Sequence, residues 1–250
     1  MKRNVLLLLL LGLAFSLAGL RPTSVSASPI FSPLIIPLDF EYSGEIPPEG
    51  SAPWLTAAFE TVFEAPGVPK GSVRLTMEAT NLTDDEFISK WYFNYNSQRD
   101  IAARAIEFTP VDISDVGGIG FARGRNFEKA GPDGDFDLLF DFPTANEDDG
   151  KQRFTDGEKV IVDLFFPDNK PYALSPDDFN FLSEPGKEIG DKGPFLSAAH
   201  IQGIGPDDNG SGWVAPNPNP TNPVPEPTPM VLLLVGLIGL IGFGCKRFKA

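Results

Sequence analysis

The sequence predicts an all-β fold, a single antiparallel β-sandwich that is jelly-roll-like and has one short helix, flanked by a signal peptide and a C-terminal transmembrane helix. Three observations support the sandwich. Apolar and polar residues alternate with a period of two in many segments, as in strands with one buried face. Turn-forming residues such as Gly131-Pro132-Asp133-Gly134 separate these segments. Finally, 42% of the 250 residues are apolar and 21 are Phe, which is enough for one packed domain.

Residues 1–27 have the pattern of a secretory signal peptide. Lys2 and Arg3 form a positive segment, and the leucine-rich run Val5–Leu20 follows it. Small residues at Val25-Ser26-Ala27 then predict cleavage after Ala27. The alternative is that this segment is retained as an N-terminal anchor.

Residues 28–215 form the predicted sandwich domain. Its strand candidates share short length, alternation and flanking turns, and they are Ile35–Tyr42, Leu55–Phe63, Ser72–Thr80, Phe87–Tyr95, Ala105–Phe108, Gly118–Phe127, Asp135–Phe142, Val160–Phe166 and Leu196–Ile204. The single helix signal is Ser175–Phe179, where Ser is suited to the N-cap and Pro176 to the first helical position.

The segment that precedes the C-terminal apolar run is a Pro/Asn-rich linker, residues 216–224, which should be stiff and extended. The apolar run Met230–Gly244 is interrupted by glycines and would span about 22 Å as a helix. That is short for a bilayer core of about 30 Å. The basic residues Lys246, Arg247 and Lys249 follow, and by the positive-inside rule they stay in the cytoplasm while the preceding domain is exported.

The end of the chain also contains the tripeptide Pro225-Glu226-Pro227, followed by this short apolar helix and the basic cluster. In this order the three parts closely resemble the PEP-CTERM sorting signal, here residues 225–250. The resemblance implies that Pro225, Glu226 and Pro227 are recognised by an exosortase, a membrane-embedded processing enzyme. It further implies an exopolysaccharide-producing host, trimming near the motif, and delivery to the cell surface or extracellular matrix. The alternative is an ordinary single-span anchor behind a stalk.

Composition excludes several kinds of chemistry. One His and one Cys supply neither a multi-histidine metal site nor a disulfide or thiolate zinc cluster. The net charge of -14 argues against nucleic acid as a partner. His200 is the only candidate base for a Ser-His-Asp triad. Its place in the alternation of Leu196–Ile204 predicts that it faces the core instead.

Asp133, Asp135 and Asp137 are candidate metal ligands, because alternating acids can supply oxygens to calcium, helped by another loop such as Glu147-Asp148-Asp149. The following positions do not fit an EF-hand, since Leu138 stands where Gly is needed and Thr144 where Glu is needed. The interpretation we favour is a solvated acidic face of a strand whose opposite face holds Phe136, Leu138, Phe140 and Phe142. A calcium site of another type is the alternative, and no other cofactor is expected.

No particular pair of carboxylates indicates a glycoside hydrolase, and no catalytic residue is assigned. Trp54, Trp91 and Trp213 could stack on sugar rings if exposed, but burial is the commoner outcome. The leading hypothesis is therefore a non-enzymatic exported protein, made as an inner-membrane-anchored precursor and sorted by an exosortase. Its role would be structural or adhesive among extracellular polysaccharides. The alternatives are a calcium-dependent carbohydrate-binding module and a secreted hydrolase that uses carboxylates.

Overall fold

Most of the predicted sandwich domain is described by a computed structural model. The described residues are 32–44, 46–63, 67–96, 103–131, 134–146, 150–167, 173–184 and 192–218. The signal peptide with Ala27, the sorting motif Pro225-Glu226-Pro227 and Asp133 lie outside them. None of the helices in the described ranges has the length and apolar character needed to cross a membrane.

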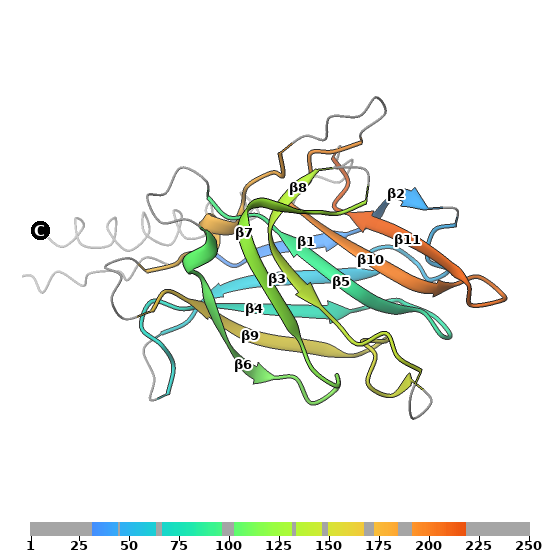
Figure 1. Cartoon of the computed structure of the whole chain (residues 1–250), viewed down its shortest axis with the longest axis horizontal. Coiled ribbons are helices and arrows are strands. Elements are labelled where there is room, and N and C mark those ends of the chain that lie inside the picture. The colour runs from blue at the N-terminus through green and yellow to red at the C-terminus, as the bar shows by residue number, and fades with distance from the viewer. Residues whose placement is uncertain are drawn as a thin grey trace, which may run out of the picture. The chain divides into compact units, whose positions relative to one another are not determined.

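The described strands form two antiparallel sheets, which face each other in Figure 1. One sheet has five strands in the order β1-β3-β4-β9-β6, with bounds Leu34–Leu38, Leu55–Thr61, Val73–Ala79, Lys159–Phe165 and Glu107–Asp112. The other has six in the order β2-β11-β10-β5-β8-β7, with bounds Phe40–Gly44, Gly210–Ala215, Ser197–Ile204, Phe87–Phe93, Asp135–Asp141 and Gly120–Lys129. The predicted all-β, two-sheet antiparallel architecture is confirmed.

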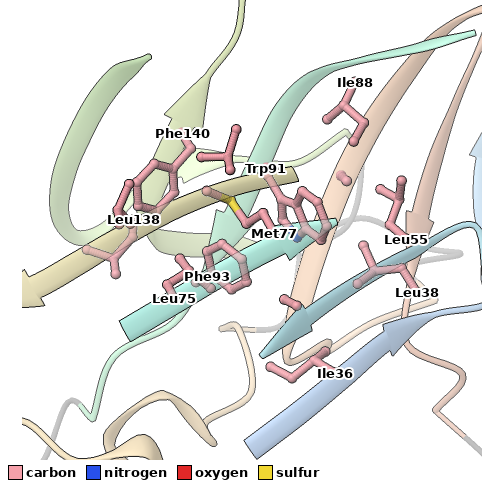
Figure 2. Packing of buried hydrophobic residues seen from close by; sticks show 14 of the residues in the cluster. Ile36, Leu38, Leu55, Leu75, Met77, Ile88, Trp91, Phe93, Leu138 and Phe140 are labelled. Atoms are coloured by element: carbon pink, nitrogen blue, oxygen red, sulfur yellow. The ribbon is translucent and has the colours of Figure 1, made fainter. Parts of the chain in front are cut away.

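The main hydrophobic core lies between the two sheets. Figure 2 shows side chains of the five-stranded sheet, such as Leu75 and Met77, facing Trp91, Phe93 and Phe140 of the six-stranded sheet. Phe140 is completely buried, as the alternation in its strand predicts. A second, smaller cluster covers the outer face of the six-stranded sheet, and it consists of Tyr42, Tyr92, Ala130, Phe136, Leu139, Phe195, Ala198 and Ala215.

Two strand predictions differ from the structure. The predicted strand Ile35–Tyr42 is divided at Asp39, because the chain passes from one sheet to the other there. The backbone N–H of Asp39 donates to the carbonyl oxygen of Ala215, and its carboxylate accepts from the N–H of Asn217. Strand β11 was missed because its glycine-rich sequence lacks a regular alternation.

The predicted short helix is confirmed as a single 3-10 turn, η3, at Pro176–Phe179. The carboxylate of Asp178 accepts a hydrogen bond of 2.9 Å from the backbone N–H of Ser175, as in a capping box. Phe179 stacks on Phe59 of β3, with ring centroids 4.4 Å apart, so the turn closes one end of the core. A second 3-10 turn, η1, lies at Ala103–Ala105.

The expectation of a solvated acidic face on β8 is wrong at Asp137. Its side chain is buried, with 4% exposure. Strand β7 contains a register shift between Arg123 and Glu128 opposite this position, and the bulge leaves a backbone N–H group to be paired. The Asp137 carboxylate accepts that N–H, from Asn126, at 2.7 Å and the N–H of Tyr95 at 3.0 Å. The carboxylate is therefore a structural acceptor for backbone N–H groups of β7 and of the segment that follows β5.

The side chains of β8 also do not share faces as predicted. Phe136 belongs to the smaller cluster on the outer face of the six-stranded sheet, whereas Leu138 and Phe140 belong to the main core. The irregular pairing with β7 is the cause, because a bulge changes which face each residue of the strand pair occupies. Asp141 at the strand's end is exposed, as expected.

Candidate functional site

The described residues form a groove on the outer face of the six-stranded sheet, which we call the polar groove. It has a volume of about 640 Å³, within the range of small-ligand sites. Its lining is dominated by hydrogen-bonding groups from strands β5, β10 and β11 and from nearby loops, and consists of Asp85, Phe87, Thr144, Asn146, Arg153, His200, Gln202, Gly203, Asp208, Asn209, Gly210 and Ser211.

Strand β10 forms the floor of the polar groove through His200 and Gln202. His200 pairs with Lys90 of β5 and Trp213 of β11, and Gln202 pairs with Phe87 and Ser211. Ala199, which precedes His200, and Ile201, which lies between His200 and Gln202, point into the main core. The prediction that His200 faces the core is therefore wrong.

The reason for this error lies at Gly203. The β10–β11 register shifts between Gln202 and Ile204, so Ile204 reaches the core although it is two positions from an outward residue. Gly203 has a φ of +78°, and a Cβ there would collide with the carbonyl oxygen of Asp85. This close approach needs glycine. Because of this bulge, Ile204 and His200 lie on opposite faces of the sheet, although simple alternation places them on the same face.

His200 is held in position from behind the groove. Its Nδ1 lies 2.9 Å from the Oγ of Ser89, whose side chain is 1% exposed, and its ring stacks on Trp213 with centroids 4.5 Å apart. Burial, with a smaller effect of Lys90, lowers the pKa of His200. The imidazole is therefore neutral at neutral pH and offers Nε2 as a hydrogen-bonding atom.

Arg153 is also fixed at the groove. Its Nε and Nη2 donate to the carbonyl oxygen of Thr144 at 3.2 and 2.9 Å, and its guanidinium lies 4.1 Å from the ring centroid of Phe87. A guanidinium over an aromatic face is a favourable cation–π arrangement. The Phe87 ring is thereby covered, while the remaining N–H groups of Arg153 stay available as donors.

Two carboxylates, Asp85 and Asp208, line the same groove. Loss of hydration and the negative charges of Asp85, Asp84 and Asp207 raise the pKa of Asp208. The two carboxylates therefore give the groove a negative electrostatic potential.

The three tryptophans offer no open ring for stacking on sugars. Trp54 and Trp91 are buried, with 7% and 0% exposure. Trp213 is half-buried, but His200 covers one of its faces. A Cβ placed on Gly131 would lie 3.2 Å from three atoms of the Trp213 ring, so the backbone of Gly131 covers the other.

The predicted calcium ligands are only partly described. Asp133 lies outside the described residues, Asp135 is half-buried at the start of β8, and Asp137 is bound to backbone N–H groups as described above. Across the ranges that are described, no three His, Cys, Asp or Glu side chains are grouped so as to hold a metal ion.

Sequence reasoning did not find the polar groove, because its residues come from segments that only long-range pairing brings together. One local signal was present. Asp207-Asp208-Asn209-Gly210 has the composition of a hairpin turn. It would have indicated β11, and with it the neighbourhood of Gln202 and Ser211.

Comparison with known proteins gives little further information. No family model matches the chain, and no curated protein matches it. A solved structure that matches is described as a biomass-sensing module from Rsgi-like proteins of Clostridium thermocellum, modules said to resemble the family 3 carbohydrate-binding module of the cellulosome. The identity is 13% and the TM-score is 0.28, with coverage of 76% of this chain and 100% of the other. No ligand is carried over from so distant a likeness.

Proposed function

We propose that this is an exported, non-enzymatic protein of the cell surface or extracellular matrix, with a structural or adhesive role among exopolysaccharides. It is made as an inner-membrane-anchored precursor, and an exosortase recognises Pro225-Glu226-Pro227 and processes it. The polar groove is its contact site for polysaccharide. The N-terminal and C-terminal sequence patterns support the export route.

The polar groove is the observation that carries the binding role. It combines hydrogen-bond donors and acceptors within a volume of about 640 Å³. Sugar hydroxyl groups both donate and accept hydrogen bonds, so they match a lining made of amides, hydroxyls and an arginine. The fixed positions of His200 and Arg153 reduce the entropy lost on binding.

The same geometry supports a role without catalysis. Ser89 is the hydroxyl next to His200, but it is buried, with 1% exposure, and its Oγ also donates to the carbonyl oxygen of His200. A nucleophile must reach its substrate.

The experiment that tests this function is a glycan array probed with the full-length protein in detergent, with and without a calcium chelator. We expect binding to extracellular polysaccharides that is the same in both conditions. Absence of any glycan binding would contradict the proposed role. Binding that disappears with the chelator would favour the calcium-dependent alternative.

A further inference from the structure

We infer that the polar groove selects an uncharged, hydroxyl-rich glycan, binds it by hydrogen bonds instead of ring stacking, and rejects sugars that carry carboxylate or sulfate groups. This inference rests on the proposed polysaccharide-binding function and names the ligand class of that site.

The aromatic rings at the groove are already covered. The guanidinium of Arg153 lies over the ring of Phe87, which is 4% exposed. His200 and Gly131 occupy the two faces of Trp213. A sugar therefore has no aromatic platform here among the described residues and must be held through its hydroxyl groups.

The floor offers polar groups in a fixed register. Gln202 on β10 stands beside Ser211 on β11, and His200 is the next outward residue along β10. The contact of His200 with Ser89 fixes the ring, so that Nε2 is left for a ligand. An amide, a hydroxyl and an imidazole in one row supply both donors and acceptors, as successive sugar hydroxyl groups require.

Charge determines which glycans are accepted. Asp85 and Asp208 both line the groove, and the charges of Asp84 and Asp207 act on Asp208 as well. An anionic sugar would add negative charge to this group, on a chain whose net charge is -14. Arg153 contributes a single positive charge to the lining, which the carboxylates outnumber. Like-charge repulsion therefore acts against acidic polysaccharides.

The test measures the affinity of the full-length protein in detergent for three polymers of similar length: a neutral glucan, a polyuronate and a glucan bearing primary amines. At about 20 mM salt, where screening is weak, we expect the neutral glucan to bind and the polyuronate to bind at least about tenfold more weakly. Equal affinity for the neutral glucan and the polyuronate would overturn the inference. Weaker binding of the amine-bearing polymer than of the polyuronate would also overturn it, because the groove carboxylates attract cations and repel anions.

Two sets of variants place the binding in the groove. Gln202→Ala and Ser211→Ala should each weaken neutral-glucan binding by about 3- to 10-fold, the effect of one lost hydrogen bond. Thr76→Ala is the control, because Thr76 is a half-buried polar residue in the other sheet, and it should leave affinity unchanged. Thermal unfolding of each variant checks that it is folded. Unchanged affinity in both folded groove variants would overturn the inference and the groove as the contact site, while leaving the exported, polysaccharide-binding role intact.

The double substitution Asp85→Asn and Asp208→Asn tests the charge filter. It should bring the affinity for the polyuronate to within about threefold of that for the neutral glucan, because the repulsive charges are removed while the polar shape is kept. If the folded double variant still rejects the polyuronate as strongly as the natural protein does, these carboxylates are not the filter. A protein that binds none of the three polymers contradicts the proposed function itself.

Discussion

Replacing the buried acid of β8 by its amide, Asp137→Asn, should destabilise the sandwich although size and shape are conserved. The two carboxylate oxygens accept backbone N–H groups of Asn126 and Tyr95 at 2.7 and 3.0 Å. Asparagine has one acceptor oxygen, so its NH₂ group must face one of these two donors. One buried N–H then loses its partner, which costs about 1 to 3 kcal/mol.

For a domain of this size, each kcal/mol corresponds to about 2 to 4 °C in Tm, so the variant should melt about 2 to 12 °C lower. Calorimetry, with chemical denaturation as a second measurement, provides the comparison. The control is Asp135→Asn in the same strand, which is half-buried and should change stability by less than about 0.5 kcal/mol. Equal Tm values for the Asp137→Asn variant and the control would refute this account of the β7 bulge.

Three further predictions concern pH, packing and export. Burial raises the pKa of Asp137 above the value of about 3.9 that applies in the unfolded chain. Its contribution to stability is therefore complete below about pH 3.9 and is lost as pH rises through the folded pKa. The difference in the free energy of unfolding between the natural protein and the Asp137→Asn variant should thus be larger near pH 3.9, the approximate unfolded pKa, than at neutral pH. Phe140→Ala should cost about 3 to 5 kcal/mol in denaturant unfolding, because Phe140 is fully buried, whereas Phe127→Ala at an exposed site should cost far less. Replacing both Leu8 and Leu9 with Arg should leave the precursor in the cytoplasm in a fractionation assay, because charge in the apolar run opposes insertion; normal secretion would contradict the signal-peptide interpretation.

Local alternation was sufficient to predict most strands of the sandwich and the helical turn at Ser175–Phe179. Segments such as Val73–Ala79 pair without irregularity along their length. The alternation of apolar and polar residues in their sequence therefore matches the alternation of buried and less buried side chains in the sheet. The division at Asp39 was not predictable from alternation, because apolar residues continue on both sides of the point where the chain changes sheets.

The candidate site was less predictable because bulges and long-range pairing determine it. Asp137 and His200 were both assigned to the wrong environment, since the register shifts beside them depend on partner strands far away in the sequence. Asp85 and Arg153 are distant from Gln202 in sequence, and only the sheet order brings them to one groove. Net charge and composition need no pairing information, and from them we expect a partner other than nucleic acid.

Intact mass spectrometry of the protein released by a host with an exosortase is the decisive test of whether this domain is exported and sorted to the cell surface or matrix. We expect a mature chain that ends near Pro225-Glu226-Pro227 and lacks Cys245. We expect Glu226→Ala to leave an unprocessed membrane-bound form that keeps the basic tail. Recovery of mature natural protein that extends to Ala250 would contradict the sorting interpretation and indicate an ordinary anchor.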